Sequence, residues 1–184
     1  MLNPKDCILY SGGAQGAEQE FGKQAEAYGI QEVNYSFDGH KIERTRGMRV
    51  LTSEELALKD VSLTYVSKLM NRTFSRAPIF RKVLQSICWQ VSGGHEVFVI
   101  GTIQEDDTVK GGTGWGAEYA KICNKPLYVF GQKRNGWYKW EKQQWIEVAP
   151  PVISHRHFSC TGTRFLEDNG RQAIAGLFER SFGK

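Results

Sequence analysis

Apolar and polar positions in the first part of the chain follow the periods of strands and of a helix. The apolar run at residues 7–11 predicts a buried strand. Residues 17–28 then repeat apolar positions at helical spacing, and Gly29 follows as a helix end. Alternation at residues 33–37 predicts a second strand. This part of the chain therefore predicts a strand, a helix and a strand, in that order.

A polar stretch separates this unit from a long helical region. Residues 38–51 are mostly polar and predict a loop at the active site. Thr52 and Glu55 have the spacing of a capping box, in which each side chain accepts a hydrogen bond from the backbone amide of the other residue. Residues 54–91 are therefore expected to be mainly helical, with a break near Pro78.

The second half of the chain continues to alternate strands with helices. The predicted elements are a strand at 96–101, a helix at 114–123, a strand at 127–130, a small aromatic hairpin around 131–150, a strand at 153–158 and a helix at 168–182. This alternation predicts an α/β fold that is Rossmann-like and doubly wound, with a mainly parallel central sheet and flanking helices. A length of 184 residues favours one domain over residues 1–184.

Composition and charge narrow the class of protein. Apolar residues make up 40% of the chain, which suffices for a buried core, and no run approaches the length that spans a bilayer. The polar N-terminus predicts no secretory signal, so we expect a cytoplasmic protein with no membrane partner. The net charge of +4 suits an anionic ligand without requiring nucleic acid. His155 and His157 lack a second ligand pair, so neither a metal nor a cofactor is predicted.

Two glycine-rich turns each lie between an apolar strand and the start of a helix. Residues 11–18 have the sequence Ser-Gly-Gly-Ala-Gln-Gly-Ala-Glu, and residues 111–118 have the sequence Gly-Gly-Thr-Gly-Trp-Gly-Ala-Glu. Glycine lets the backbone approach a ligand closely, and the amides at a helix start attract phosphate. We therefore expect phosphate near Gly13 and Gly112, most simply from a nucleotide or phosphorylated sugar held between the turns. Neither turn has the Gly-Lys-Ser/Thr of a P-loop or the spacing of the dinucleotide fingerprint.

The candidate ligand-binding residues lie in these turns and at three further places. Those in the turns are Ser11, Gly12, Gly13, Gln15, Gly16, Glu18, Gly111, Gly112, Thr113 and Gly114. Outside them, His40 follows the second strand, Asn71 and Arg72 interrupt a helical run, and Thr163 and Arg164 belong to a third glycine turn. Each type has a structural alternative: helix capping for Ser and Thr, a packed histidine, a surface ion pair for the arginine, and a plain strand-to-helix connection for the third turn.

The two glycine turns resemble signatures of the SLOG superfamily. Residues 11–18 are similar to its first signature, Ser-Gly-Gly followed by Gly-Ala-Asp, and residues 111–118 to its second, Gly-Gly-x-Gly-Thr-x-x-Glu. The resemblance covers about residues 7–130. This superfamily includes the "lonely guy" cytokinin-activating phosphoribohydrolases, DNA-processing Smf-type proteins and nucleotide-sensing domains of bacterial defence proteins. The resemblance implies a nucleotide-binding domain and, by analogy, a homodimer or higher homo-oligomer.

Three functions follow as hypotheses. The first is a phosphoribohydrolase-like enzyme that cleaves the N-glycosidic bond of a nucleotide or an ADP-ribose-like compound, with Glu118 as its catalytic carboxylate beside the ribose. The structural alternative for Glu118 is a carboxylate favoured by the helix dipole. The hydrolases carry a proline where Lys110 stands and a second glutamate that this motif lacks. A non-catalytic sensor or sequestering protein for a nucleotide-derived signal is therefore the alternative function. A single-stranded DNA binder is a minor one, because the charge is mild.

Overall fold

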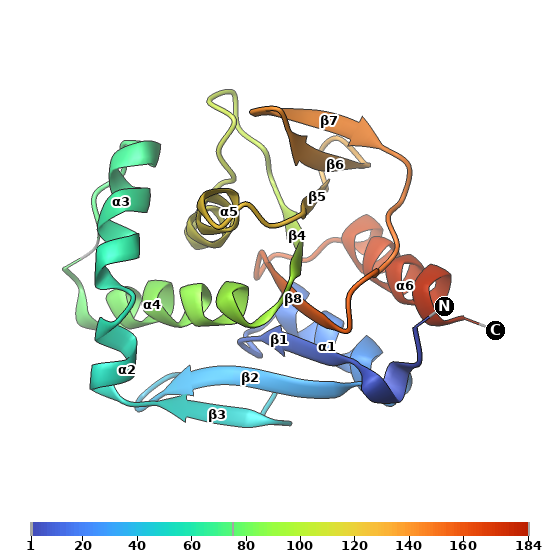
Figure 1. Cartoon of the computed structure of the whole chain (residues 1–184), viewed down its shortest axis with the longest axis horizontal. Coiled ribbons are helices and arrows are strands. Elements are labelled where there is room, and N and C mark those ends of the chain that lie inside the picture. Colours follow the sequence, from blue (N-terminus) through green and yellow to red (C-terminus); the bar gives the residue numbers. More distant parts are fainter. Residues whose placement is uncertain (1, 75, 184) are drawn as a thin grey trace.

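An eight-stranded sheet runs through the part of the chain that the computed structural model describes, residues 2–74 and 76–183 (Figure 1). Its strands are β1 (Ile8–Ser11), β2 (Gln31–Phe37), β3 (Met48–Leu51), β4 (Glu96–Gly101), β5 (Leu127–Gly131), β6 (Gly136–Glu141), β7 (Gln144–Val148) and β8 (His157–Gly162). They lie in the order β3-β2-β1-β8-β4-β5-β6-β7. Every pair from β3 to β5 is parallel, and β6 and β7 add an antiparallel hairpin at one edge. The predicted mainly parallel sheet is confirmed.

Helices flank this sheet on both faces. They are α1 (Ala17–Ala27), α2 (Ser53–Ala57), α3 (Asp60–Met70), α4 (Pro78–Gly93), α5 (Gly112–Ile122) and α6 (Asp168–Phe182), with a short 3-10 turn, η1, at Pro4–Asp6. Successive side chains of a strand point to opposite faces. Phe98 and Ile100 of β4 accordingly join the core formed with α1 and α6, whereas Val97 and Val99 join the core formed with α3, α4 and α5. Among the helices described, none is both long enough and apolar enough to cross a bilayer.

The stretch at residues 38–51 is not all loop, because β3 occupies its end. Three of the four residues of β3 are exposed, and only Leu51 is buried. This edge strand therefore lacks the alternation of apolar and polar residues that marks a half-buried strand. It pairs in parallel with β2, so backbone hydrogen bonds rather than an apolar face hold it in the sheet.

The last strand lies further along the chain than the predicted 153–158. Ile153 is buried but does not pair in the sheet, and its amide donates to the Ser181 hydroxyl at 2.8 Å. The strand β8 instead buries polar residues, among them Ser159 and Thr161. The Ser159 hydroxyl donates to the carbonyl of Gln90 at 2.6 Å. Hydrogen bonds of this kind satisfy the buried hydroxyls. Because the strand buries polar residues, its sequence has no continuous apolar run from which the strand could be predicted.

A buried carboxylate holds the segment between β2 and β3. Glu32 accepts hydrogen bonds from Nε and Nη2 of Arg44, both at 2.6 Å, and from Nη1 of Arg46 at 2.5 Å. The side chain of Glu32 is fully buried and that of Arg44 is 14% exposed. The carbonyl of Gly13 accepts the amides of Glu43 and Arg44, each at 3.0 Å. These contacts dock the segment onto the first glycine turn.

Replacing Glu32 with Ala is expected to destabilise the protein by about 3–5 kcal/mol, because it leaves a largely buried guanidinium without its carboxylate. Glu141→Gln is the control, since the ion pair of Glu141 with Lys139 is exposed and such pairs contribute about 0–1 kcal/mol. Urea unfolding of both variants measures the difference. Equally small losses for the two variants would contradict this role of Glu32.

Candidate functional site

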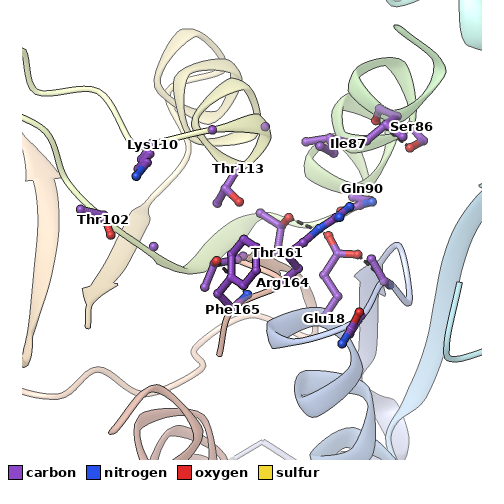
Figure 2. A pocket seen from close by; sticks show the side chains of 18 of the residues that line it. Glu18, Ser86, Ile87, Gln90, Thr102, Lys110, Thr113, Thr161, Arg164 and Phe165 are labelled. Atoms are coloured by element: carbon purple, nitrogen blue, oxygen red, sulfur yellow. Dashed lines mark hydrogen bonds between the residues drawn. The ribbon is translucent and has the colours of Figure 1, made fainter. Parts of the chain in front are cut away.

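A cavity of about 510 Å³ opens at the carboxyl ends of the central strands (Figure 2). The segments that follow β1, β4 and β8 line it, and α4 supplies a further wall. Ligands of parallel α/β sheets bind outside the carboxyl ends of the strands. Both the position and the size of this cavity therefore make it the candidate ligand site.

The structure brings only part of the predicted set to this cavity. The predicted residues that line it are Gln15, Glu18, His40, Gly111, Gly112, Thr113, Thr163 and Arg164. Those that do not line it are Ser11, Gly12, Gly13, Gly16, Asn71, Arg72, Gly114 and Glu118.

The first glycine turn is occupied by the protein's own carboxylate. Glu18 accepts backbone hydrogen bonds from Gly12 and from Ala14, the latter at 3.1 Å, and a hydrogen bond from the Thr161 hydroxyl at 2.7 Å. The amide of Ala17, at the start of α1, donates to the carbonyl of Thr163 at 3.0 Å. Three amides in and just after this turn, those of Gly12, Ala14 and Ala17, therefore already have acceptors within the protein, and the phosphate expected near Gly13 stays a prediction.

Three of the predicted glycines are required by close backbone packing instead. A Cβ on Gly13 would meet the carbonyl oxygen of Arg44, and a Cβ on Gly114 would meet that of Val109. Gly16 has a φ of +91°, and a Cβ there would lie 2.6 Å from the backbone of Arg164. Only glycine fits such approaches.

Ser11 likewise serves the fold. Its buried hydroxyl donates to the carbonyl of Cys160 at 2.8 Å. This contact links β1 to β8, its parallel neighbour in the sheet. The hydroxyl therefore has a structural partner instead of a place in the cavity.

The amino end of α5, by contrast, opens into the cavity. Gly111 is its N-cap, with a φ of +72° and no side chain to accept a hydrogen bond, and the first turn of α5 holds no acidic residue. Across residues 2–74 and 76–183 no acceptor bonds the amides of Gly112 and Thr113, both of which line the cavity. Lys110 and Arg164 line it as well. Unpaired amides, the helix dipole and two cations together favour an anion here.

Arg72 supports this turn from outside the cavity. Its guanidinium donates to the carbonyls of Val109 and Gly111, at 3.2 and 3.4 Å, and to the side chains of Gln104 and Thr108. Asn71 ends α3 in the left-handed conformation. Both residues lie in a neighbouring open hollow that shares Gly111, Gly112 and Phe80 with the cavity. Arg72 therefore holds the turn before α5 in place and does not itself line the cavity.

Glu118 does not face the cavity. Its carboxylate lies 3.0 Å from Nζ of Lys121, and that ammonium lies over the ring of Trp140 at 3.7 Å. Helical geometry explains the placement. Thr113 lines the cavity, and five residues further on a helix has turned by about 500°, which leaves Glu118 about 140° away from Thr113. The carboxylate that does line the cavity is that of Glu18.

His40 lies at the edge of the cavity. Its ring stacks on that of Phe37 with centroids 4.3 Å apart, and its Nδ1 is 3.2 Å from the hydroxyl of Ser36. Burial lowers the pKa of His40 below its usual value, so the neutral imidazole prevails at pH 7. A neutral ring offers the ligand a hydrogen bond without a charge.

Sequence analysis missed the wall that α4 provides. Phe80, Val83, Ile87 and Gln90 of this helix line the cavity. Gln90 is 2% exposed, and within the described residues its Oε1 has no hydrogen-bond partner. The one available signal was a glutamine on the same helical face as the apolar positions.

The aromatic rim was missed too. Phe165 lies in the turn after β8 and is 77% exposed, and Phe80 is 43% exposed. Gln132 holds the Phe165 turn by donating to the carbonyl of Phe165 at 3.1 Å and accepting the amide of Glu167 at 2.7 Å. An exposed aromatic ring in a loop carries no periodic pattern, so its place at the cavity mouth appears only in the folded chain.

Comparison with known proteins gave no match: no family model, no curated protein and no solved structure is similar to this chain at a significant level. Inference about function therefore rests on the geometry of the cavity.

The pH dependence of stability should change in a Glu18→Gln variant. Burial raises the pKa of Glu18 above its usual 4.5, so the folded protein holds the proton more tightly than the unfolded chain does. Raising the pH above about 4.5 then costs the wild type stability that the variant does not lose. The free energy of unfolding of the variant relative to the wild type should rise with pH and level off above the folded pKa.

Urea unfolding between about pH 4 and pH 8 measures this difference. The hydrogen bonds that glutamine cannot replace add a constant offset and leave the slope unaffected. Glu141→Gln, at an exposed position, is the control. A difference between Glu18→Gln and wild type that is independent of pH would contradict the raised pKa.

Proposed function

We propose that this protein binds a nucleotide or a nucleotide-derived ligand, with a phosphate group at the amino end of α5. One observation carries the proposal: the uncapped start of α5 opens into a cavity that Lys110 and Arg164 also line. A helix start of this kind binds phosphate through its backbone amides, and the cations add attraction over a longer range.

The remaining walls suit the nucleoside part of such a ligand. Val83 and Ile87 are apolar, and the exposed rings of Phe80 and Phe165 stand at the rim. Exposed aromatic rings stack on nucleobases. A cavity of about 510 Å³ suits a small molecule better than a strand of nucleic acid, which needs an extended groove.

We also infer that the fold is doubly wound, in keeping with the SLOG resemblance. Counted outward from β8, the sheet continues through β1, β2 and β3 on one side and through β4 and β5 on the other. The direction in which successive strands are added therefore changes once, between β8 and β4. The turn after β8 and the start of α5 lie at this point, which is where doubly wound proteins bind nucleotides.

Cleavage of the ligand is a second candidate, and the position of Glu18 favours it. This buried carboxyl lines the cavity and has a raised pKa, which is typical of a general acid. In the reaction the bond from C1′ of the ribose to the base nitrogen breaks, and the base leaves with the proton of Glu18. The hydroxide part of a water molecule bonds to C1′, and its proton restores Glu18. The products are the free base and a ribose phosphate.

Gly112→Val should weaken ligand binding strongly without disturbing the fold. A Cβ at Gly112 would meet only Cε2 of Phe80, at an ordinary 3.8 Å, so the added side chain occupies space that the phosphate would use. We expect affinity for the four ribonucleoside 5′-monophosphates and ADP-ribose to fall roughly 10- to 100-fold, as expected when hydrogen bonds to a charged group are lost.

The control for this variant is Gly136→Val, in the hairpin and outside the cavity, where a Cβ would have ordinary contacts of 3.4 Å or more. Calorimetry measures affinity, and thermal unfolding checks that both variants fold. Binding of none of these compounds by the wild type, or unchanged affinity in folded Gly112→Val, would overturn the proposal.

Glu18→Gln and Glu118→Gln form a matched pair for the cleavage candidate. Loss of a general acid should slow base release roughly 10²- to 10⁴-fold in Glu18→Gln with little change in affinity. Glu118→Gln should leave the rate unchanged, because its carboxylate pairs with Lys121 outside the cavity. Mass spectrometry of bound and released species measures both. Intact ligand recovered from the wild type would overturn cleavage and favour the sensor. If only Glu118→Gln slowed base release, Glu118 and not Glu18 would be the catalytic residue.

A further inference from the structure

Gln90 has a hydrogen-bonding group that the protein leaves unused. The side chain is 2% exposed and lines the cavity, yet its Oε1 has no partner among residues 2–74 and 76–183 (Figure 2). Buried polar atoms in folded proteins are nearly always paired, and an exception needs an explanation. One explanation is that Oε1 accepts a hydrogen bond from the ligand, so that this atom is paired once the cavity is filled.

The neighbour of this amide is the carboxylate of Glu18. Figure 2 shows the two side chains next to each other, on α4 and α1. A Cβ on Gly12 would touch Nε2 of Gln90 and would lie 2.8 Å from Oε2 of Glu18, so both side chains meet above this glycine. Because the oxygens of Glu18 already accept hydrogen bonds from Gly12, Ala14 and Thr161, the unpaired acceptor here is Oε1 of Gln90, and the part of the ligand that reaches it must carry a hydrogen-bond donor.

The other walls indicate which part of a nucleotide this is. The anion site at Gly112 and Thr113 takes the phosphate, and the exposed rings of Phe80 and Phe165 at the rim suit the base. The ribose then lies between them, and its hydroxyl edge is directed inward. A ribose hydroxyl is a donor that can pair with Oε1 of Gln90.

We propose that Gln90 accepts a hydrogen bond from a ribose hydroxyl of the bound nucleotide and thereby selects ribonucleotides over their deoxy counterparts. This inference rests on the proposed function and deepens it, because it specifies the sugar of the ligand. A site built to hydrogen-bond a hydroxyl rejects an analogue that lacks it, since the buried acceptor is then left unpaired.

Calorimetry with each ribonucleoside 5′-monophosphate and its 2′-deoxy and 3′-deoxy counterparts tests the proposal on the unmodified protein. For each ribonucleotide that binds, at least one of its two deoxy counterparts should bind at least roughly tenfold more weakly than the ribonucleotide does. In Gln90→Met, which keeps the side-chain length and removes the acceptor, the ribonucleotide should lose this factor while the deoxy compound keeps its affinity. The ratio of the two affinities should therefore approach one.

Gln85→Met is the matched control. Gln85 lies on the same helix and is also buried, but its amide donates to Asp60 at 2.6 Å outside the cavity, so the wild-type ratio should persist. Equal affinities for ribo and deoxy compounds in the wild type would overturn this inference and leave the proposed function intact. An unchanged ratio in Gln90→Met, or a changed preference for the base instead of the sugar, would also overturn it. Failure of all four monophosphates and of ADP-ribose to bind would overturn both.

Discussion

The buried carboxylate of Glu18 is the interaction on which the arrangement of the site depends. It lies at the start of α1, accepts the amides of Gly12 and Ala14, and accepts the hydroxyl of Thr161 from β8. A carboxyl group withdrawn from water is tolerated where donors surround it. Its three donors come from the turn after β1 and from the end of β8, so the carboxyl holds these two segments together. Part of the hydrogen-bonding capacity of the first glycine turn is thus used within the protein.

The two glycine turns look alike in sequence and differ in use, because their acidic residues stand at different distances from the helix start. Glu18 is the second residue of α1, where a side chain folds back onto the amides of the preceding turn. Glu118 is well inside α5 and pairs with Lys121, so the first turn of α5 keeps its amides. A shared motif therefore gives one turn whose carboxylate joins two segments of the protein and one whose helix start has no side-chain cap.

The elements that the sequence predicted well are those with a clear period or a long apolar run. The strand at 96–101 and the helix at 168–182 appear with the predicted bounds. Strand β3 has too few buried residues to show a pattern of apolar positions, and β8 buries Ser and Thr residues, which a sequence pattern counts as polar. The position of Gln90 in the cavity follows from how α4 crosses the sheet, which is a property of packing and not of local sequence. Glycines that pack against a distant backbone, such as Gly16 against Arg164, are hidden for the same reason.

The candidate site joins residues from opposite ends of the sequence. The hydrogen bond from Thr161 to Glu18 spans 143 residues, and that from Ser11 to Cys160 spans 149. Because β8 pairs with both β1 and β4, the cavity is incomplete until this last strand has entered the centre of the sheet. Closing so long a stretch of chain costs conformational entropy, which the finished sheet offsets. A ligand held between α5 and the turn after β8 would bind only the closed arrangement, so binding and the insertion of β8 would stabilise each other.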